Sequence, residues 1–126
     1  DNEHFIIKEY IDNMYTCMCA SDLIITRAGA MTLTELMAIG RASILIPYPY
    51  AAENHQYYNA LTLQNANAGR IIDDKELTGA VLIDTVTKLT DDPELLKLMS
   101  ENAAKLSKHD AAGVILREIT DLMGLE

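Results

Sequence analysis

The sequence is poor in basic residues and has no long apolar run. Its 126 residues include 10 lysines and arginines against 19 aspartates and glutamates, which gives a net charge of -9. A nucleic-acid-binding face needs basic side chains to neutralise phosphates, so this balance argues against nucleic acid as a partner. It argues equally against docking of this segment on anionic lipid. No apolar run approaches the roughly 20 residues of a membrane-spanning helix.

Cysteine is represented only by Cys17 and Cys19. Residues two positions apart on a helix point in different directions, and no second pair of Cys or His lies nearby. We therefore expect two small apolar residues in a reducing compartment. No trio of His, Cys or carboxylate residues has the spacing of metal ligands, and no Ser or Cys stands in a nucleophile elbow. The sequence predicts neither a metal site nor a cofactor.

Apolar residues make up 49% of the chain, enough for the core of one domain spanning residues 1–126. Short apolar runs predict strands at 4–10, 23–26, 42–46 and 70–72. Periodic apolar residues and caps predict helices at 14–20, 31–39 and 54–65, then three amphipathic helices at 77–89, 92–106 and 110–123. The prolines at 47–50 predict an extended segment.

This alternation of strands and helices predicts an α/β fold, a Rossmann-like parallel sheet with flanking helices. Right-handed crossovers place the carboxyl ends of all strands at one edge of the sheet. About four strands is fewer than usual. We therefore expect further strands before the N-terminal end of this chain.

The loop after the strand at 23–26 is a candidate anion site. Ligands of open parallel sheets bind beyond the carboxyl ends of the strands. Gly29 and Ala30 leave little bulk over the next helix, whose free N–H groups and dipole suit a diphosphate. Glu35, one turn further on, can accept two hydrogen bonds from ribose hydroxyls. Thr32 and Glu35 equally fit a capping box that only satisfies the helix's own amides.

A second loop, at 47–56, ends in His55 and Gln56, and Asn59 shares a helix face with Gln56. Amides beside aromatic residues are suited to binding sugar hydroxyls. The same pattern also fits a polar helix start whose tyrosines pack in the core. Arg27 leaves two readings as well, a phosphate contact or a surface ion pair with Asp or Glu.

Three blocks carry a resemblance to a known family. They read YIDNM at 10–14, SDLIITRAGAMTLTE at 21–35 and PYPYAAENHQ at 47–56. In this order and spacing the chain resembles the C-terminal domain of the MurG family of glycosyltransferases. Members of that family have the two-domain GT-B fold. They bind the donor in the C-terminal domain and the acceptor across the cleft between domains.

The resemblance implies a binding site for UDP-N-acetylglucosamine. Ile11 would contact the uracil through its backbone, Glu35 would hold the ribose hydroxyls, and Gln56 with His55 would bind the N-acetylglucosamine. The helix N-terminus would hold the diphosphate and stabilise charge on the departing UDP. That N-terminus comprises Ala30, Met31, Thr32, Leu33 and Thr34, with Arg27, Gly29 and Asn59 as further candidates. The resemblance implies no metal and no cofactor.

The resemblance also implies lipid I as the acceptor, attacking the anomeric carbon with inversion, in a peripheral enzyme at the cytoplasmic face of the bacterial membrane. The family's N-terminal domain and its Gly-Gly-Ser loop are absent from these 126 residues. The residues expected to bind lipid I and to remove its proton are absent with them, so we expect this chain alone to be inactive. The helix at 110–123 would pack toward that domain, and its apolar face could drive self-association.

Three alternatives remain open at this point. The first is a donor-binding subunit of a split glycosyltransferase, completed by a membrane-anchored partner. The second is a nucleotide-sugar epimerase of the same two-domain fold. The third is a non-catalytic α/β nucleotide-binding module in which Thr32 and Glu35 only cap a helix.

Overall fold

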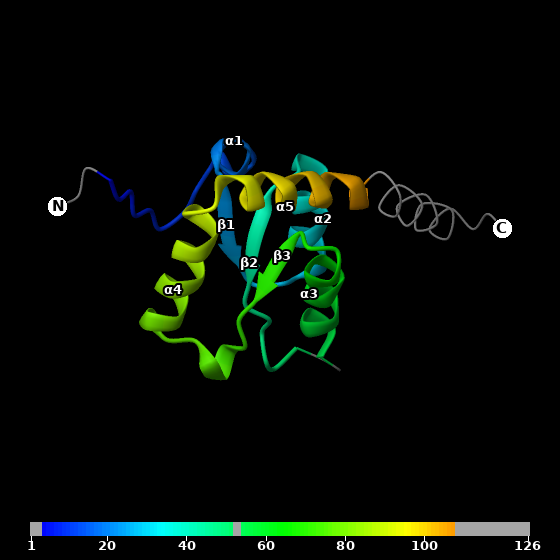
Figure 1. Ribbon diagram of the computed structural model, residues 1–126. Helices are drawn as coiled ribbons and strands as arrows, with labels where there is room; N and C mark the ends of the chain where they lie inside the picture. The colour runs from blue at the N-terminus through cyan, green and yellow to red at the C-terminus, as the bar shows by residue number, and fades with distance from the viewer. Residues whose placement is uncertain (1–3, 52–53, 108–126) are drawn as a thin grey trace, which may run out of the picture.

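The computed structural model describes residues 4–51 and 54–107 and shows a parallel sheet with helices on both faces (Figure 1). The elements in chain order are α1 (Met14–Ala20), β1 (Leu23–Thr26), α2 (Ala30–Ile39), β2 (Ala42–Leu45), α3 (His55–Asn65), β3 (Gly69–Ile71), the 3-10 turn η2 (Asp74–Glu76), α4 (Gly79–Thr90) and α5 (Pro93–Leu106). The strands pair in the order β1-β2-β3, all parallel. The predicted Rossmann-like α/β class is confirmed.

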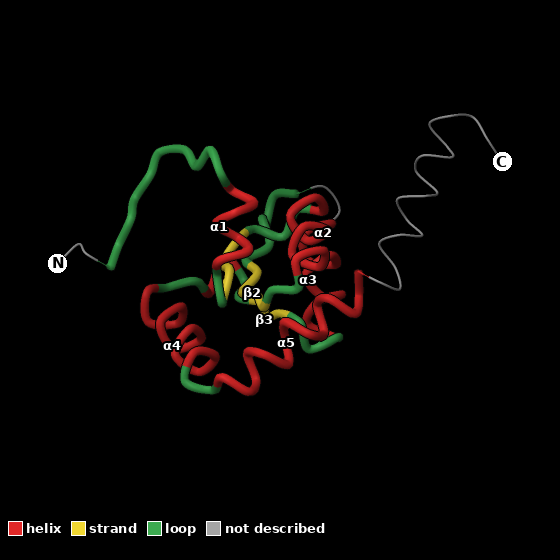
Figure 2. The backbone as a smooth tube through the Cα atoms, turned by 90° about the horizontal axis from the view of Figure 1, so that it is seen from above, coloured by secondary structure: helices red, strands yellow, loops and turns green. Residues whose placement is uncertain are grey.

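β2 is the central strand, and all four of its residues are buried. Successive side chains of a strand point to opposite faces, so β2 contributes to two separate cores. Leu45 packs with residues of α2 and α3, whereas Ala42 and Ile44 pack with residues of α4 and α5. Figure 2 shows the strands between these helices.

Helix α5 crosses the amino-terminal edge of the sheet (Figure 1). The backbone N–H of Ala42, at the start of β2, donates to the Ser100 hydroxyl of α5 at 3.1 Å. The adjacent residue Met99 lies in the core with α4, and Ala103, one turn later, lies in the core with α2 and α3. This helix therefore ties the two layers together at the edge where the strands begin.

The predicted C-terminus of a helix at Gly40 and the predicted start of another at 92–94 are both confirmed. Gly40 ends α2 in the left-handed region, at φ 65°, where a side chain is disfavoured. Asp92 caps α5 by accepting a hydrogen bond from the N–H of Leu95 at 3.1 Å, with Pro93 in the first turn. Thr78 caps α4 in the same way.

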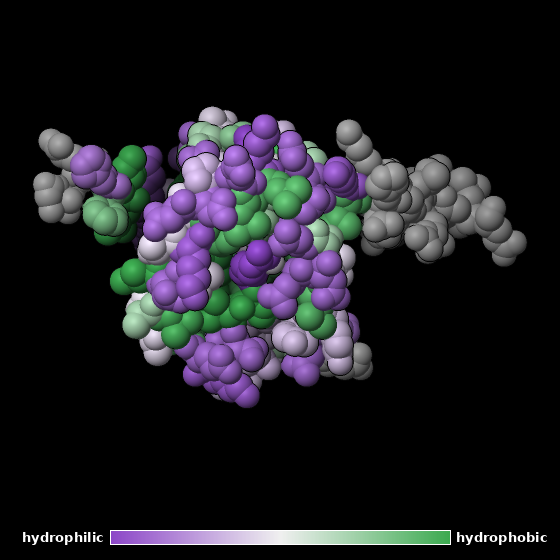
Figure 3. Space-filling model, in the orientation of Figure 1, coloured by the Kyte–Doolittle hydropathy of each residue, from purple (hydrophilic) through white to green (hydrophobic). Residues whose placement is uncertain are grey.

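The predicted strand at 4–10 is wrong, and the sheet has three strands rather than about four within the described residues. Phe5, Ile6 and Ile7 are 70%, 83% and 95% exposed. The N-terminal segment that contains them projects from the body of the molecule (Figures 1 and 3). A strand requires a neighbour to satisfy its N–H and C=O groups. Within the described part β1 pairs only with β2, so the segment gains no ladder.

The expected extended conformation at 47–50 is only partly found. Pro49 and Tyr50 form a turn, closed by the N–H of Ala51 donating to the Tyr48 carbonyl at 3.3 Å. The predicted helix at 110–123 lies outside the described residues. No helix in the described part is both long enough and apolar enough to cross a membrane.

Candidate functional site

The two loops singled out in the sequence lie side by side at the carboxyl edge of the sheet. β1 and β2 are parallel and in register up to Thr26 and Leu45. The N–H of Ile46 continues this ladder by donating to the Thr26 carbonyl at 2.9 Å. The chain after β1 therefore leaves the sheet next to the chain after β2, as the predicted crossovers require.

Two side chains of helix α3 form hydrogen bonds with the first of these loops, at the backbone of Ala28. Gln56 Oε1 accepts hydrogen bonds from the N–H of Ala28 at 3.1 Å and from the N–H of Tyr48 at 2.9 Å. Asn59 Nδ2 donates to the Ala28 carbonyl at 3.3 Å. The sequence assigned Gln56 and Asn59 to sugar hydroxyls and did not foresee these bonds. Only their spacing of three residues signalled that they act on one face.

The capping-box reading of Thr32 and Glu35 is wrong. The N-cap of α2 is Gly29, in extended conformation, so Thr32 lies inside the first turn. No side chain caps this helix, and its first turn contains no acidic residue. Helices α4 and α5, by contrast, have side-chain caps.

The first amides of α2 are consequently available to a ligand. The first bond of the helix ladder is the N–H of Leu33 donating to the Gly29 carbonyl at 3.0 Å. The N–H groups of Ala30, Met31 and Thr32 donate to no described residue. Unpaired amides at the positive end of a helix dipole are suited to binding an anion.

The side chains of this first turn contribute unequally. The Leu33 side chain is apolar and buried, and the Thr34 hydroxyl donates to the Ala30 carbonyl at 3.0 Å, so neither side chain donates to a ligand. Met31 is 81% exposed beside the free amides. Glu35 is exposed and makes no hydrogen bond or ion pair with any described residue, which leaves both carboxylate oxygens free to accept.

Of the two alternatives left open for Arg27, the structure shows the ion pair. Its Nη1 atom lies 2.6 Å from Asp74 Oδ1 in η2 and 3.3 Å from the Ile46 carbonyl, to which it donates. The centre of its guanidinium group lies 5.7 Å from the Tyr48 ring centroid, within range of a cation–π contact. One side chain thus connects the loops that follow β1, β2 and β3.

The reading that packed the tyrosines of 47–59 in the core is wrong. Tyr48 and Tyr50 contact each other edge to face at 5.6 Å between ring centroids, and Tyr57 and Tyr58 do so at 6.0 Å. All four are exposed, because Ala60 and Leu63 are the α3 residues that face the core. Aromatic rings therefore border the edge where the two loops meet.

The two other predicted site residues lie at the start of α3 and just before α1. His55 is exposed at the start of α3, next to Gln56. Ile11 is half-buried just before α1, and within the described residues no hydrogen bond joins it to the loops after β1 and β2. No group of three or more His, Cys, Asp or Glu in the described ranges is placed to hold a metal ion.

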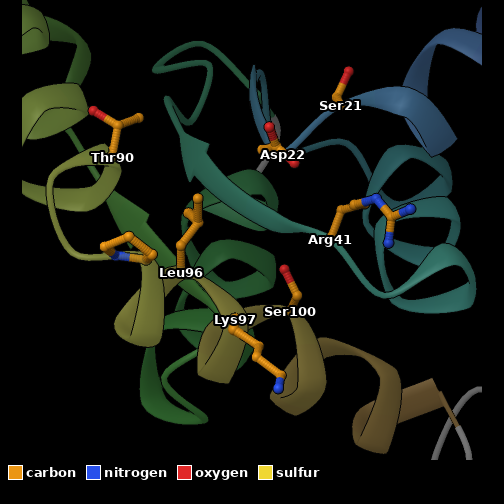
Figure 4. A pocket seen from close by; sticks show the side chains of 8 residues that line it. Ser21, Asp22, Arg41, Thr90, Leu96, Lys97 and Ser100 are labelled. Atoms are coloured by element: carbon orange, nitrogen blue, oxygen red, sulfur yellow. The ribbon is translucent and has the colours of Figure 1, made fainter.

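A pocket of about 520 Å³ lies at the opposite edge, where the strands begin (Figure 4). Its lining residues are Ser21, Asp22, Arg41, Thr90, Pro93, Leu96, Lys97 and Ser100. Arg41 donates to the carbonyls of Cys19 at 2.6 Å, Ile39 at 3.1 Å and Gly40 at 3.0 Å. It therefore caps the C-terminal ends of α1 and α2. In α1, a hydrogen bond and an electrostatic interaction with Cys19 raise the pKa of Tyr15.

Comparison with known proteins identifies the family of this chain. Residues 1–115 match the model of the glycosyltransferase family 28 C-terminal domain. The chain belongs to this family.

Two curated relatives of this family 28 chain share the name UDP-N-acetylglucosamine--N-acetylmuramyl-(pentapeptide) pyrophosphoryl-undecaprenol N-acetylglucosamine transferase. The chain is 42% identical to the protein of Desulforamulus reducens over 124 residues, which cover 96% of the chain and 33% of the relative. It is 48% identical to that of Thermoanaerobacter sp. over 116 residues, which cover 92% of the chain and 32% of the relative. The chain thus spans about a third of the length of these relatives.

Among solved structures, the family 28 chain resembles the crystal structure of Acinetobacter baumannii MurG. The TM-score is 0.74 at 34% sequence identity, and the match covers 82% of this chain and 29% of that one. The predicted resemblance to the MurG family is confirmed.

Proposed function

We propose that this chain is the donor-binding part of an inverting glycosyltransferase. The reaction is transfer of N-acetylglucosamine from UDP-N-acetylglucosamine to lipid I, which makes lipid II for peptidoglycan. The observation that carries the proposal is the uncapped N-terminus of α2, followed one turn later by an unpartnered carboxylate, Glu35. The name of the relatives from Desulforamulus reducens and Thermoanaerobacter supports both the donor and the acceptor.

The diphosphate of the donor binds at the start of α2. The free amides of Ala30, Met31 and Thr32 donate hydrogen bonds to its oxygens, and the helix dipole favours its negative charge. Glu35 accepts hydrogen bonds from the two ribose hydroxyls. This assignment explains why α2 has no side-chain cap, because a capping oxygen would compete with the phosphate for the same amides.

The sugar and the base extend from this anchor in opposite directions. Gln56 and His55, at the start of α3, bind the N-acetylglucosamine, and Asn59 supports them through Ala28. The backbone of Ile11 binds the uracil. No metal is needed, because the amides of α2 stabilise the charge that grows on UDP as the glycosidic bond breaks.

The acceptor binds outside these residues. The binding site for lipid I and the group that removes its proton are assigned to the N-terminal domain of a longer protein. That protein is peripheral at the cytoplasmic face of the membrane. This chain alone binds donor and does not turn it over. We also expect copies of this chain to self-associate through residues 110–123, and concentration-dependent light scattering measures this directly.

The decisive experiment is a titration of the chain with UDP-N-acetylglucosamine, UDP and ADP, followed by amide NMR shifts. Donor binding predicts shifts at Ile11, at Ala30 to Glu35 and at Gln56, larger for the two uridine ligands than for ADP. Equal shifts with ADP would remove the uridine specificity. Absence of shifts at millimolar ligand, in a chain that remains folded, would count against donor binding by this chain.

A further inference from the structure

Both backbone polar groups of Ala28 are held by side chains of α3. Gln56 accepts from the Ala28 N–H at 3.1 Å, and Asn59 donates to the Ala28 carbonyl at 3.3 Å. Ala28 is fully buried, and the next residue, Gly29, is the N-cap of α2. The position of the first amides of α2 is therefore set by α3.

The carbonyl oxygen of Gln56 is fully used in this arrangement. An amide oxygen has two lone pairs, and those of Oε1 accept from the N–H groups of Ala28 and Tyr48. This oxygen cannot also accept from a sugar hydroxyl. The Nε2 atom lies 4.0 Å from the place that a Cβ on Gly29 would occupy, so the donating end of the amide faces the start of α2.

We infer that Gln56 is a positioning residue for the donor site, acting through its oxygen atom. By bridging Ala28 and Tyr48 it fixes the loop that carries the α2 amides against the loop that precedes α3. The inference rests on the proposed donor function and deepens it. It predicts that Gln56 matters for UDP itself, which contains no sugar for the side chain to contact.

Helix α3 supplies a matched control. Gln64 Oε1 accepts from the N–H of Ile71 in β3 at 2.9 Å, and Gln64 is half-buried like Gln56. Gln56→Leu and Gln64→Leu therefore remove the same chemical group from the same helix. Only the first change releases the two loops at the carboxyl edge.

The test measures UDP and UDP-N-acetylglucosamine affinities of the chain and both variants by calorimetry. We expect Gln56→Leu to weaken UDP binding about tenfold or more, since two backbone hydrogen bonds are lost, and Gln64→Leu to change it less than about twofold. If Gln56→Leu weakens only the sugar nucleotide and leaves UDP unchanged, the inference is overturned while the proposed function stands. If the unmodified chain binds neither ligand, the proposed function itself fails.

Hydrogen exchange tests, without any ligand, the two hydrogen bonds that join Gln56 to Ala28 and Tyr48. We expect the amides of Ala28 and Tyr48 to exchange about tenfold faster or more in Gln56→Leu, and at the original rate in Gln56→Glu, which keeps an accepting oxygen. Unchanged exchange in Gln56→Leu would contradict the bridge. Should that variant not fold, Asn59→Ala releases only the Ala28 carbonyl and is expected to weaken UDP binding by a smaller factor.

Discussion

Arg27 and Asp74 form an ion pair, with 2.6 Å between Nη1 and Oδ1, that joins the loop after β1 to the turn after β3. The same guanidinium group donates to the Ile46 carbonyl and lies over the Tyr48 ring. The three loops at the carboxyl edge are thereby linked through one side chain. The ion pair itself is open to solvent, with the two side chains 49% and 34% exposed.

The two partners are expected to contribute unequally to stability. Arg27→Ala should lower the free energy of unfolding by about 1 kcal/mol, because a hydrogen bond and a ring contact are lost with the ion pair. Asp74→Ala should lower it by about 0.5 kcal/mol or less, since an exposed ion pair is screened by solvent. Urea denaturation of both variants at low and high salt measures the difference. Equal losses would show that the ion pair alone matters.

Glu35→Ala is expected to separate ligand binding from folding. Glu35 is exposed and unpartnered, so its removal should change the free energy of unfolding by about 0.5 kcal/mol or less. UDP affinity should fall about tenfold, the loss expected for hydrogen bonds to a charged acceptor. Glu101→Ala, an exposed glutamate of α5, is the control and should leave affinity unchanged. Unaltered UDP binding in Glu35→Ala would remove the ribose assignment.

Ser43→Ala and Ser100→Ala are expected to change stability in opposite directions. Ser43 Oγ is fully buried and has no hydrogen-bond partner among the described residues, so replacing it should raise the free energy of unfolding by about 1 kcal/mol. Ser100 Oγ accepts from the Ala42 N–H, and its loss should lower that free energy by about 1 kcal/mol. Thermal unfolding of both variants checks the signs. Destabilisation by Ser43→Ala would point to an unseen partner for that hydroxyl.

Gly40→Ala is expected to destabilise the fold by about 1–2 kcal/mol, because the left-handed conformation disfavours a side chain. The added Cβ would also lie 3.1 Å from the Ala104 Cβ of α5, so the packing of α2 on α5 must shift. Gly79→Ala is the matched control, since a Cβ there meets nothing within 4 Å and φ is not positive. Chemical denaturation should show Gly79→Ala within about 0.5 kcal/mol of the unmodified chain. Similar losses at both glycines would contradict this account.

The sequence predicted the local elements well because their signals are local. The cap at Asp92, the stop at Gly40 and the apolar runs at β1 and β2 act over a few residues. The strands and helices predicted between residues 14 and 106 appear within one or two residues of their expected bounds. The strand predicted at 4–10 failed for the opposite reason. Its apolar residues favour a strand, but a strand forms only where a neighbour supplies hydrogen bonds.

Some features of the candidate site could likewise be predicted from the sequence. These were the convergence of two loops at one edge, the small residues at 28–30, Glu35 and the family blocks. The roles of individual polar side chains were not. Arg27 fitted a phosphate or an ion pair equally, and Thr32 fitted a cap that the helix does not use.

The sequence by itself determined the order of strands and helices, the parallel sheet and the family to which the chain belongs. Only the tertiary structure decided that Gln56 bridges Ala28 and Tyr48, that Arg27 reaches Asp74, and that the Ser43 hydroxyl is buried without a described partner. The reason is separation along the chain. Gln56 lies 28 residues from Ala28, and Arg27 lies 47 residues from Asp74. Periodicity and caps report on neighbours within a few turns, whereas these partners are chosen when the strands bring their loops to a common edge.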